Sequence, residues 1–211
     1  MAKLITAGRW FLQIVRSFES SGIDCQALCV DVGIDYATLE ESDGRIDMDL
    51  ASKFWIAVTE KTGNPEIGLE LAKGAKLGGL KALGYSLLSS NTIKDSLQRL
   101  VRYQQIMGES GSFYLEENDD NYALCIDLVG NKYPVPYQAI DAGFASIFHY
   151  VGWVLQKEIT PLAVQLKRPA PKSTKPYEKM FHCTPLFDQF DIDEAIETAL
   201  SRNTPLPSGG G

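Results

Sequence analysis

GLKALGYSLLSSNTIKDSLQRLVRYQQIM, residues 79–107, decides the fold, because it holds two helical patterns and ends where the strand patterns begin. The Ser-Ser-Asn break at 89–91 separates the two helices, and Asn91 or Thr92 can accept hydrogen bonds from the first amides of the second one. Asp95 suits the first turn of that helix. Its buried stripe is predicted to be Ile93, Leu97, Leu100, Val101 and Met107.

The residues before this stretch also read as helices. A first helix is predicted from Leu4 to Phe18, with Gly22 at its close, and Asp24 is expected to cap a short helix that Gly33 ends. After the Asp43-Gly44 turn, Asp47 can cap a longer helix that carries Leu50, Phe54, Trp55 and Val58 and stops at Gly63-Asn64-Pro65. Pro65 suits the start of a further helix through Ile67, Leu69 and Leu71.

Strand patterns begin after Met107. Phe113 to Glu117 and Tyr122 to Leu128, joined by the polar turn 118–121, predict a hairpin. Further expected elements are a helix from about Pro136 to Lys157, a strand Ala163 to Lys167, a short helix Tyr177 to Phe181 and a strand Pro185 to Phe190, whereas Ile192 to Ala199 is ambiguous. The predicted class is α+β: a mainly helical N-terminal layer, residues 1–107, followed by a small mixed or antiparallel sheet with packed helices, residues 108–207.

Composition limits the classes of function. The 211 residues are 45% apolar, enough for a buried core, and 20 basic against 27 acidic residues give a net charge of −7, the wrong sign for a chain that neutralises many phosphates. The four cysteines lie in apolar contexts, and the chain shows neither a signal peptide nor a membrane-spanning run, so we expect a reduced, cytoplasmic protein without a membrane role. Ser208-Gly-Gly-Gly is typical of a linker or an added tail.

LCVDVGIDYATLEES, residues 28–42, has the outline of a DNA-reading helix-turn-helix, with Gly33 at the turn and Asp35 as a cap. Electrostatics argue against that function. From Asp24 to Asp49 there are eight acidic residues and a single base, Arg45, whereas a recognition helix needs basic or amide side chains aimed at phosphates and base edges. The segment is therefore interpreted as two short helices that pack into the helical layer.

Catalytic and metal-binding patterns are weak. His149 and His182 are the two histidines, and neither lies at a metal-ligand spacing, while Cys25 and Cys29 lack partners at zinc-finger spacing and are better explained as packed thiols. No Gly-x-Ser-x-Gly elbow or phosphate-binding glycine fingerprint occurs. We therefore expect no enzyme, metal or cofactor.

Three stretches together resemble a known family. GLKALGYSLLSSNTIKDSLQRLVRYQ, VQLKRPAPKSTKPYEKMFHCTPLFDQF and SRNTPLP follow, in order and spacing, the pattern of the effector-binding N-terminal domain in a large branch of the AraC-type bacterial transcription regulators. SGIDCQALCVDVGID and NPEIGLELAK fit the same family's helical opening. The chain departs from the pattern at Phe181-His182-Cys183, where a phenylalanine-glycine pair is usual.

This resemblance implies a regulatory domain, residues 1–207, that binds a small effector, forms a homodimer and controls a C-terminal DNA-binding domain. That domain, made of two helix-turn-helix units, would begin after Pro207 and is absent from this chain, so any contact with DNA would be made only through it. Residues 208–211 would be linker or tail. The resemblance also implies a strand from Glu194 to Thr198, where composition alone suggests a helix.

Candidate effector-binding residues combine apolar bodies with polar tips on predicted helices. They are Tyr85, Arg102, Tyr103, His149, Tyr150 and Trp153. A structural role is an alternative for each: Tyr103 and Trp153 also suit an ordinary core, His149 a half-buried hydrogen bond, and Arg102 a helix surface. Lys167 and Arg168 could hold an anionic effector or simply be solvated.

Two classes of function thus stay open: the effector-sensing domain and a ligand-free dimerisation or protein-interaction module. An enclosed pocket with mixed lining would favour the first, and a filled core with an exposed apolar patch the second. An enzyme would require His149 or His182 to meet an acid or a thiol in a cleft.

Overall fold

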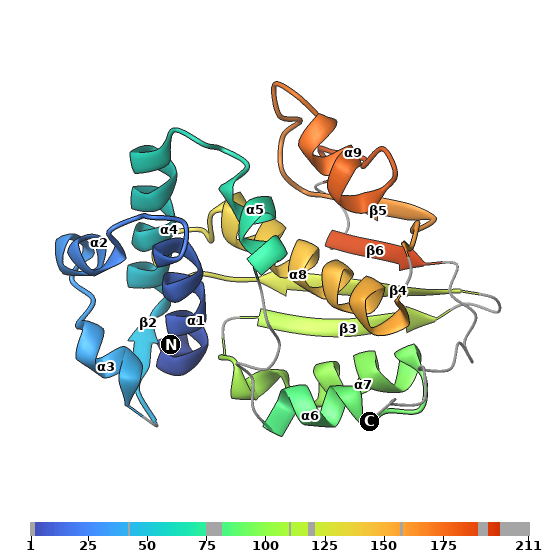
Figure 1. Cartoon of the computed structure of the whole chain (residues 1–211), viewed down its shortest axis with the longest axis horizontal. Coiled ribbons are helices and arrows are strands. Elements are labelled where there is room, and N and C mark those ends of the chain that lie inside the picture. Colours follow the sequence, from blue (N-terminus) through green and yellow to red (C-terminus); the bar gives the residue numbers. More distant parts are fainter. Residues whose placement is uncertain are drawn as a thin grey trace. The chain divides into compact units, whose positions relative to one another are not determined.

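The computed structural model of the chain describes residues 3–41, 43–74, 82–109, 111–117, 121–156, 158–189 and 194–198 (Figure 1). Contacts divide the chain into two compact units, each assembled from three segments. The first unit comprises Met1–Gly79, Gln104–Gly111 and Leu128–Ser146. The second unit comprises Leu80–Tyr103, Ser112–Asp127 and Ile147–Gly211, so residues 80–103 belong with the sheet that follows them in sequence.

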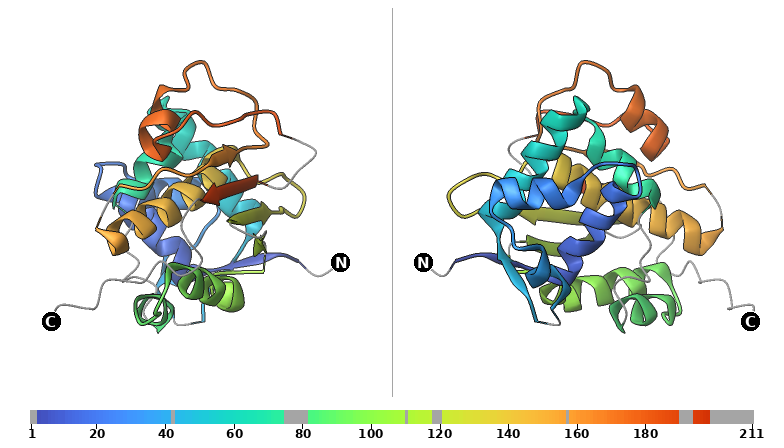
Figure 2. Two further views of the ribbon diagram at one scale, coloured as in Figure 1. Left: turned by 90° about the vertical axis from the view of Figure 1, so that its right-hand side faces the viewer. Right: turned by 60° about the vertical axis from the view of Figure 1, so that its left-hand side comes forward.

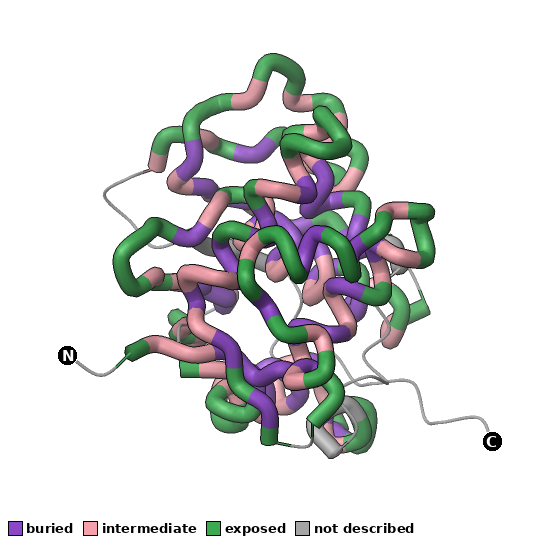
Figure 3. Tube along the Cα trace, turned by 90° about the vertical axis from the view of Figure 1, so that its left-hand side faces the viewer, coloured by how far each residue is buried: buried purple, intermediate pink, exposed green. Residues whose placement is uncertain are grey.

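Helices dominate the first unit. Its elements begin with β1 (Ile5–Ala7), α1 (Gly8–Glu19), α2 (Cys25–Val32), α3 (Tyr36–Glu40), β2 (Arg45–Asp47), α4 (Met48–Thr62) and α5 (Ile67–Gly74). A 3-10 turn, η2 (Gln104–Ile106), and the first part of α8 (Tyr137–Leu155) also belong to it. In Figure 3 buried, intermediate and exposed residues follow one another along the helical turns of the tube, as expected when one face of a helix packs into a core.

The predicted caps of these helices are confirmed. The Asp24 carboxylate accepts a hydrogen bond from the Ala27 amide at the start of α2, and the Asp47 carboxylate accepts one from the Asp49 amide at the start of α4. Gly33 and Gly63 end the same two helices in the left-handed conformation, with φ of 85° and 61°. A glycine is favoured at such positions because it has no Cβ to clash with the backbone.

Aromatic rings form the centre of the first unit's core. Phe54 of α4 is fully buried and packs edge-on against Phe11 of α1, with ring centroids 5.2 Å apart. Phe18 contacts both Phe54 and Trp55, at 6.3 and 5.4 Å between centroids. These residues come from the predicted apolar stripes of α1 and α4, so periodicity identified the core correctly.

The start of α1 differs from the prediction. Leu4 and Ala7 were expected in the first helix, but α1 begins at Gly8 and the preceding residues form β1. β1 pairs in antiparallel register with β2, Ile5 opposite Asp47, and β2 was not predicted at all. Strands of three residues carry too little periodicity to be recognised, and their stability comes from main-chain pairing between distant segments.

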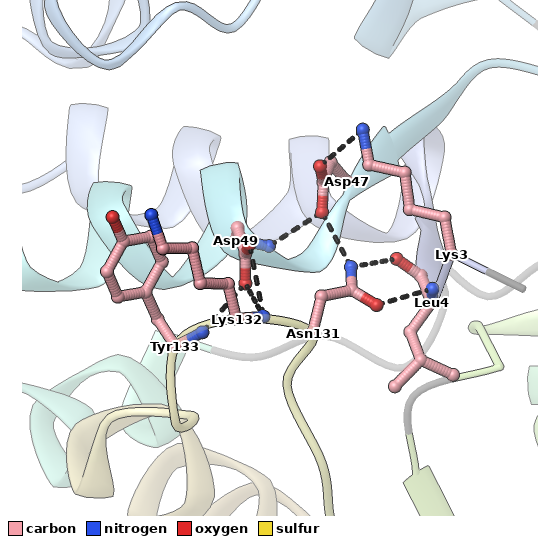
Figure 4. Close-up of polar contacts among 7 residues, drawn as sticks. All are labelled: Lys3, Leu4, Asp47, Asp49, Asn131, Lys132 and Tyr133. Carbon is pink, nitrogen blue, oxygen red and sulfur yellow. Dashed lines mark hydrogen bonds and ion pairs between the residues drawn. The ribbon is translucent and has the colours of Figure 1, made fainter. Parts of the chain in front are cut away.

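Asn131 holds the loop before α8 against this small sheet (Figure 4). Its side-chain oxygen accepts a hydrogen bond from the Leu4 amide at 2.7 Å, and its side-chain nitrogen donates to the Leu4 carbonyl at 2.9 Å and to the Asp47 carboxylate at 2.7 Å. One amide side chain thus mimics a strand partner for β1 and joins it to the N-terminus of α4.

Two carboxylates, Asp47 and Asp49, also hold the first unit's N-terminal segment and the loop before α8 in place. Asp49 accepts hydrogen bonds from the backbone amides of Lys132 and Tyr133, at 3.0 and 3.1 Å, and Lys3 pairs with Asp47 at 2.7 Å (Figure 4). Burial raises the pKa of Asp47, but the hydrogen bonds from Lys3, the Asp49 amide and Asn131 lower that pKa by more, so it lies below the usual value.

The second unit holds the larger sheet. Its elements are α6 (Ala82–Leu88), α7 (Ile93–Tyr103), β3 (Gly111–Glu117), β4 (Tyr122–Leu128), the last part of α8, β5 (Ala163–Gln165), α9 (Lys175–Phe181) and β6 (Glu194–Thr198). The strand order is β3-β4-β6-β5, and β6 is antiparallel to both of its neighbours. In Figures 1 and 2, α6 and α7 lie beside β3 at one edge of this sheet, and α9 lies beyond β5 at the other.

The α+β class is confirmed, as is the predicted order of helices and strands after residue 79, with exceptions in the last thirty residues. The expected strand from Pro185 is wrong over the described residues: only Leu186 makes a bridge, parallel to Gln165 of β5. Asp188 has a positive φ of 60°, which ends the extended conformation there. The strand Glu194–Thr198, implied by the family resemblance, is confirmed. Residues 79–81, 118–120, 157, 190, 192–193, 199 and 207–211, which some predictions include, lie outside the described residues.

Candidate functional site

Helix α7 has two chemically different faces. Ile93, Ser96, Leu97 and Leu100 are buried along one side, as the predicted stripe required. The Thr92 hydroxyl accepts a hydrogen bond from the Asp95 amide at 3.0 Å, so Thr92, one of the two predicted caps, starts the helix. Val101 is half-buried, and Met107 is buried but lies beyond the end of α7.

The opposite, polar face of α7 borders a cavity of about 500 Å³ that is open to solvent, unlike the enclosed pocket predicted for an effector sensor. Its lining residues recur at steps of three and four, the spacing of one helix face: Asn91, Asp95, Gln98, Arg99 and Arg102. A volume of this size suits a small metabolite. The lining places two guanidinium groups and one carboxylate around the same space, which gives the cavity a positive balance within a chain of negative net charge.

Arg99 is held in place by α6. Its Nη1 donates to the Ser86 carbonyl at 2.7 Å and to the Ser89 hydroxyl at 3.1 Å, at the C-terminal end of that helix. A cation near a helix C-terminus is favoured by the exposed carbonyls and the helix dipole. Both bonds use one nitrogen, so the other nitrogens of the guanidinium fork make no hydrogen bond to these two residues.

Ser96 joins three helices on the buried side of α7. Its hydroxyl lies 3.2 Å from the Leu87 carbonyl of α6 and 2.9 Å from the Tyr150 hydroxyl of α8. Burial raises the pKa of Tyr150, and the hydrogen bond with Ser96 lowers it by less, so this phenol is neutral at physiological pH. The polar chain from α8 through α7 to α6 lies behind the wall of the cavity.

The six predicted binding residues all belong to the second unit, but they have different surroundings. Arg102 is exposed and lines the cavity, whereas Tyr150 is 5% exposed and points to Ser96 on the other side of α7. Tyr85, Tyr103 and Trp153 are 77%, 42% and 61% exposed, and His149 is exposed as well. The alternative that placed Tyr103 and Trp153 in the core, and His149 in a half-buried position, is therefore wrong.

The sequence-based selection missed Asn91, Asp95, Gln98 and Arg99 as lining residues. Their signal was present as a polar stripe at steps of three and four along α7. Such a stripe does not by itself predict a binding site, because the polar face of a helix usually meets solvent.

Lys167 and Arg168 are not the solvated pair that was considered as an alternative. Lys167 is half-buried and its ammonium lies 3.7 Å from the Asp127 carboxylate. Arg168 is 7% exposed; it donates a hydrogen bond to the Tyr177 hydroxyl, and its guanidinium lies 5.3 Å from the centre of that ring. These contacts tie β5 and the loop after it to neighbouring elements.

The helix-turn-helix outline at 28–42 is part of the scaffold. Leu28, Cys29, Ile34 and Leu39 are buried in the core of the first unit. Burial raises the pKa of Cys25 to about 12 and that of Cys29 to about 11, so both thiols are protonated at neutral pH, as expected for packed cysteines. The described residues include no cluster of histidine, cysteine and acidic side chains that could hold a metal ion. None of the described helices could cross a membrane.

Comparison with solved structures first defines the fold. The chain is similar to the crystal structure of the transcriptional regulator CdpR from Pseudomonas aeruginosa, with a TM-score of 0.53 and 16% sequence identity over 67% of this chain. The match covers 46% of that protein, so the chain corresponds to less than half of its length. The chain therefore shares the fold of part of a transcription regulator.

The family follows from the sequence itself. Residues 22–191 match the family described as "Arabinose-binding domain of AraC transcription regulator, N-term". No curated protein sequence matches the chain significantly. Because the match spans most of the 211 residues, the chain belongs to this family of effector-sensing regulatory domains, as the resemblance had predicted.

Proposed function

We propose that the chain is the sensor of an AraC-type regulator, binds a small effector through the second unit, and forms a homodimer in the cytoplasm. The match of residues 22–191 to the effector-binding domain of this family carries the proposal. The cavity on α7 supports it, because about 500 Å³ lined by amide and charged groups suits a small polar molecule. Contact with DNA would be made by a helix-turn-helix domain outside this chain.

The proposed binding site combines the cavity with the other predicted residues of the second unit. Arg102 would contact the polar part of the effector, and Tyr85, Tyr103, His149 and Trp153 would cover its remaining surface, since their exposed rings can close over a ligand. Tyr150 would act through Ser96, which supports the wall formed by α7.

Sensing follows from linkage. An effector shifts the domain between two arrangements only by as much as it binds one of them more tightly. A change in α6 or α7 would reach α8 through the bonds that join Leu87, Ser96 and Tyr150. Binding alone is sufficient for this role, and we propose that the domain has no catalytic activity. Protonated thiols at Cys25 and Cys29 support that view, because the thiolate is the nucleophile.

A thermal-shift screen of metabolites, followed by calorimetry, tests the proposal. We expect at least one metabolite to raise the melting temperature of the chain and to bind with one site per protomer. Arg102→Ala and Trp153→Ala should weaken that binding, whereas Lys61→Ala, an exposed basic residue on α4, should leave it unchanged. The sensor function is contradicted if no metabolite binds while the full-length regulator still responds to its inducer in cells.

The exposed rings of the second unit favour one alternative, a dimerisation or protein-interaction module without a ligand. Tyr85 and Trp153 are 77% and 61% exposed, which is high for such large side chains. In that case Trp153→Ala would dissociate the homodimer in sedimentation velocity, and no metabolite would bind. If the same variant stays dimeric and loses metabolite binding, the interaction module is excluded.

A further inference from the structure

We propose that the cavity on α7 selects small molecules that carry a carboxylate, and that Arg99 and Arg102 bind this group between them. The inference rests on the proposed function, because it names the chemical class of the effector and adds Arg99 to the site. Three features of the described residues carry it: the positive balance of the cavity, the spacing of the two arginines, and the support that α6 gives to Arg99.

The two arginines suit one anionic group. They are three residues apart on α7 and therefore neighbours on its surface. The side chain of Arg102 makes no hydrogen bond or ion pair with the other described residues, so its donors are available to a ligand. A guanidinium offers parallel N–H groups that match the two oxygens of a carboxylate, which makes arginine the preferred partner for this group.

Arg99 is oriented in advance. Its bonds to the Ser86 carbonyl and the Ser89 hydroxyl fix the guanidinium at the wall of the cavity and occupy a single nitrogen. A side chain whose rotamer is already fixed loses less conformational entropy when a ligand binds. Ser89 is thus a positioning residue, and ligand binding to Arg99 would stabilise the C-terminal turn of α6.

Asp95 provides a test of the sign of the ligand's charge. Its side chain lines the same cavity one helical turn before Arg99. A carboxylate there repels an anionic ligand and attracts a cationic one. Removing its charge must therefore strengthen the binding of a carboxylate, whereas the same change would weaken the binding of an amine.

Matched pairs of probes separate charge from shape. Calorimetry and NMR titration of the whole chain would compare benzoate with benzamide, hexanoate with hexanamide, and succinate with succinamide. We expect at least one carboxylate to bind while its neutral amide does not, and high salt to weaken that binding, since both guanidinium groups are accessible to solvent.

Variants then assign the binding to this cavity. Arg102→Ala and Arg99→Ala should each weaken the carboxylate by about tenfold or more, because hydrogen bonds to charged groups are strong. Asp95→Asn should strengthen it several-fold, and Ser89→Ala should weaken it less than Arg99→Ala does. Lys61→Ala is the matched control for a lost positive charge. Arg99→Ala also removes the hydrogen bonds to α6 and could unfold the chain. In that case Arg102→Ala, at an exposed position, tests the inference.

Three results would overturn the inference: binding of amides as tightly as carboxylates, unchanged binding in Arg102→Ala, or weaker binding in Asp95→Asn. A complete lack of carboxylate binding would overturn it as well. The proposed sensor function would still stand in each case if a neutral or cationic metabolite bound elsewhere in the second unit, so the two failures can be distinguished.

Discussion

Both units have buried apolar residues, but polar side chains also join the helices of the second unit. In the first unit α1 and α4 pack through aromatic rings, and Phe54 touches both Phe11 and Phe18. In the second unit α6, α7 and α8 are joined by hydroxyl and guanidinium groups, from Ser96 to Tyr150 and from Arg99 to Ser86. Removing a buried apolar side chain lowers the free energy of unfolding by roughly 2–5 kcal/mol, whereas a hydrogen bond that exchanges its partner changes it little. This difference supports the proposal that the second unit, rather than the first, responds to the effector.

Phe54→Ala should have the largest effect on stability. Removing a fully buried ring from a packed core costs about 3–5 kcal/mol, and Phe54 is 0% exposed between Phe11 and Phe18. Urea denaturation followed by circular dichroism measures the loss. Ile56→Ala, two residues away on the exposed side of α4 at 45% exposure, should change the free energy of unfolding by less than about 1 kcal/mol. Equal losses for the two variants would contradict an apolar scaffold centred on Phe54.

Gly68→Ala should have the next largest effect, because α5 and the start of α8 are in direct backbone contact in the first unit. A Cβ at residue 68 would lie 2.1 Å from the Gln138 carbonyl oxygen, so the backbone must move. Overpacking of this kind costs about 1–3 kcal/mol. Gly143→Ala is the matched control on α8: a Cβ there meets no atom within 4 Å, and alanine should stabilise the helix by about 0.5–1 kcal/mol. Thermal unfolding should therefore shift in opposite directions for the two glycines.

Tyr150→Phe tests the second unit and should cost less than either change in the first. The variant keeps the ring and removes the hydroxyl that bonds to Ser96, while Ser96 retains the Leu87 carbonyl as a partner. The expected loss is about 0.5–1.5 kcal/mol of unfolding free energy. Tyr85→Phe, at 77% exposure, is the control and should leave stability unchanged. If Tyr150→Phe destabilised the chain as much as Phe54→Ala, the contrast between polar and apolar contacts among the helices would not hold.

Sequence periodicity and capping residues predicted the helical scaffold well. Asp24, Asp47 and Gly33 act locally, within one turn of the backbone, so their roles can be read without knowledge of the fold. β1 and β2 were missed because their stability depends on pairing between residues about forty positions apart, with Ile5 opposite Asp47.

The site was harder to predict than the scaffold. The candidates chosen from the sequence included Arg102, which lines the cavity, but not Arg99, whose importance depends on its contacts with Ser86 and Ser89 at the C-terminal end of α6. The alternative that placed the candidate residues Tyr103 and Trp153 in the core by helical spacing is wrong, because both are exposed. Spacing along one helix predicts which residues share a face. Which of the faces is buried depends on the other elements that pack against the helix.

The smallest expected effect concerns His182, where the chain departs from the family pattern. His182 ends α9 with φ of 56° and ψ of 22°, the left-handed conformation that glycine adopts without strain. This geometry explains why a phenylalanine-glycine pair is usual there. His182→Gly should therefore relieve about 1 kcal/mol of backbone strain. The gain is partly offset, because the imidazole packs against Phe148 with ring centroids 6.0 Å apart and glycine also increases the entropy of the unfolded chain.

The sign of the His182→Gly effect separates backbone from side-chain contributions at this helix end. His182→Ala removes the same ring contact and keeps the strained conformation, so it is the matched control. Differential scanning calorimetry should show His182→Gly to be more stable than His182→Ala by about 1 kcal/mol, whatever the value of the ring contact with Phe148. If the alanine variant were the more stable of the two, the left-handed backbone at residue 182 would not be the reason for the glycine of the family pattern. Side-chain packing would then determine where α9 ends in the second unit, as it determines the core of the first unit.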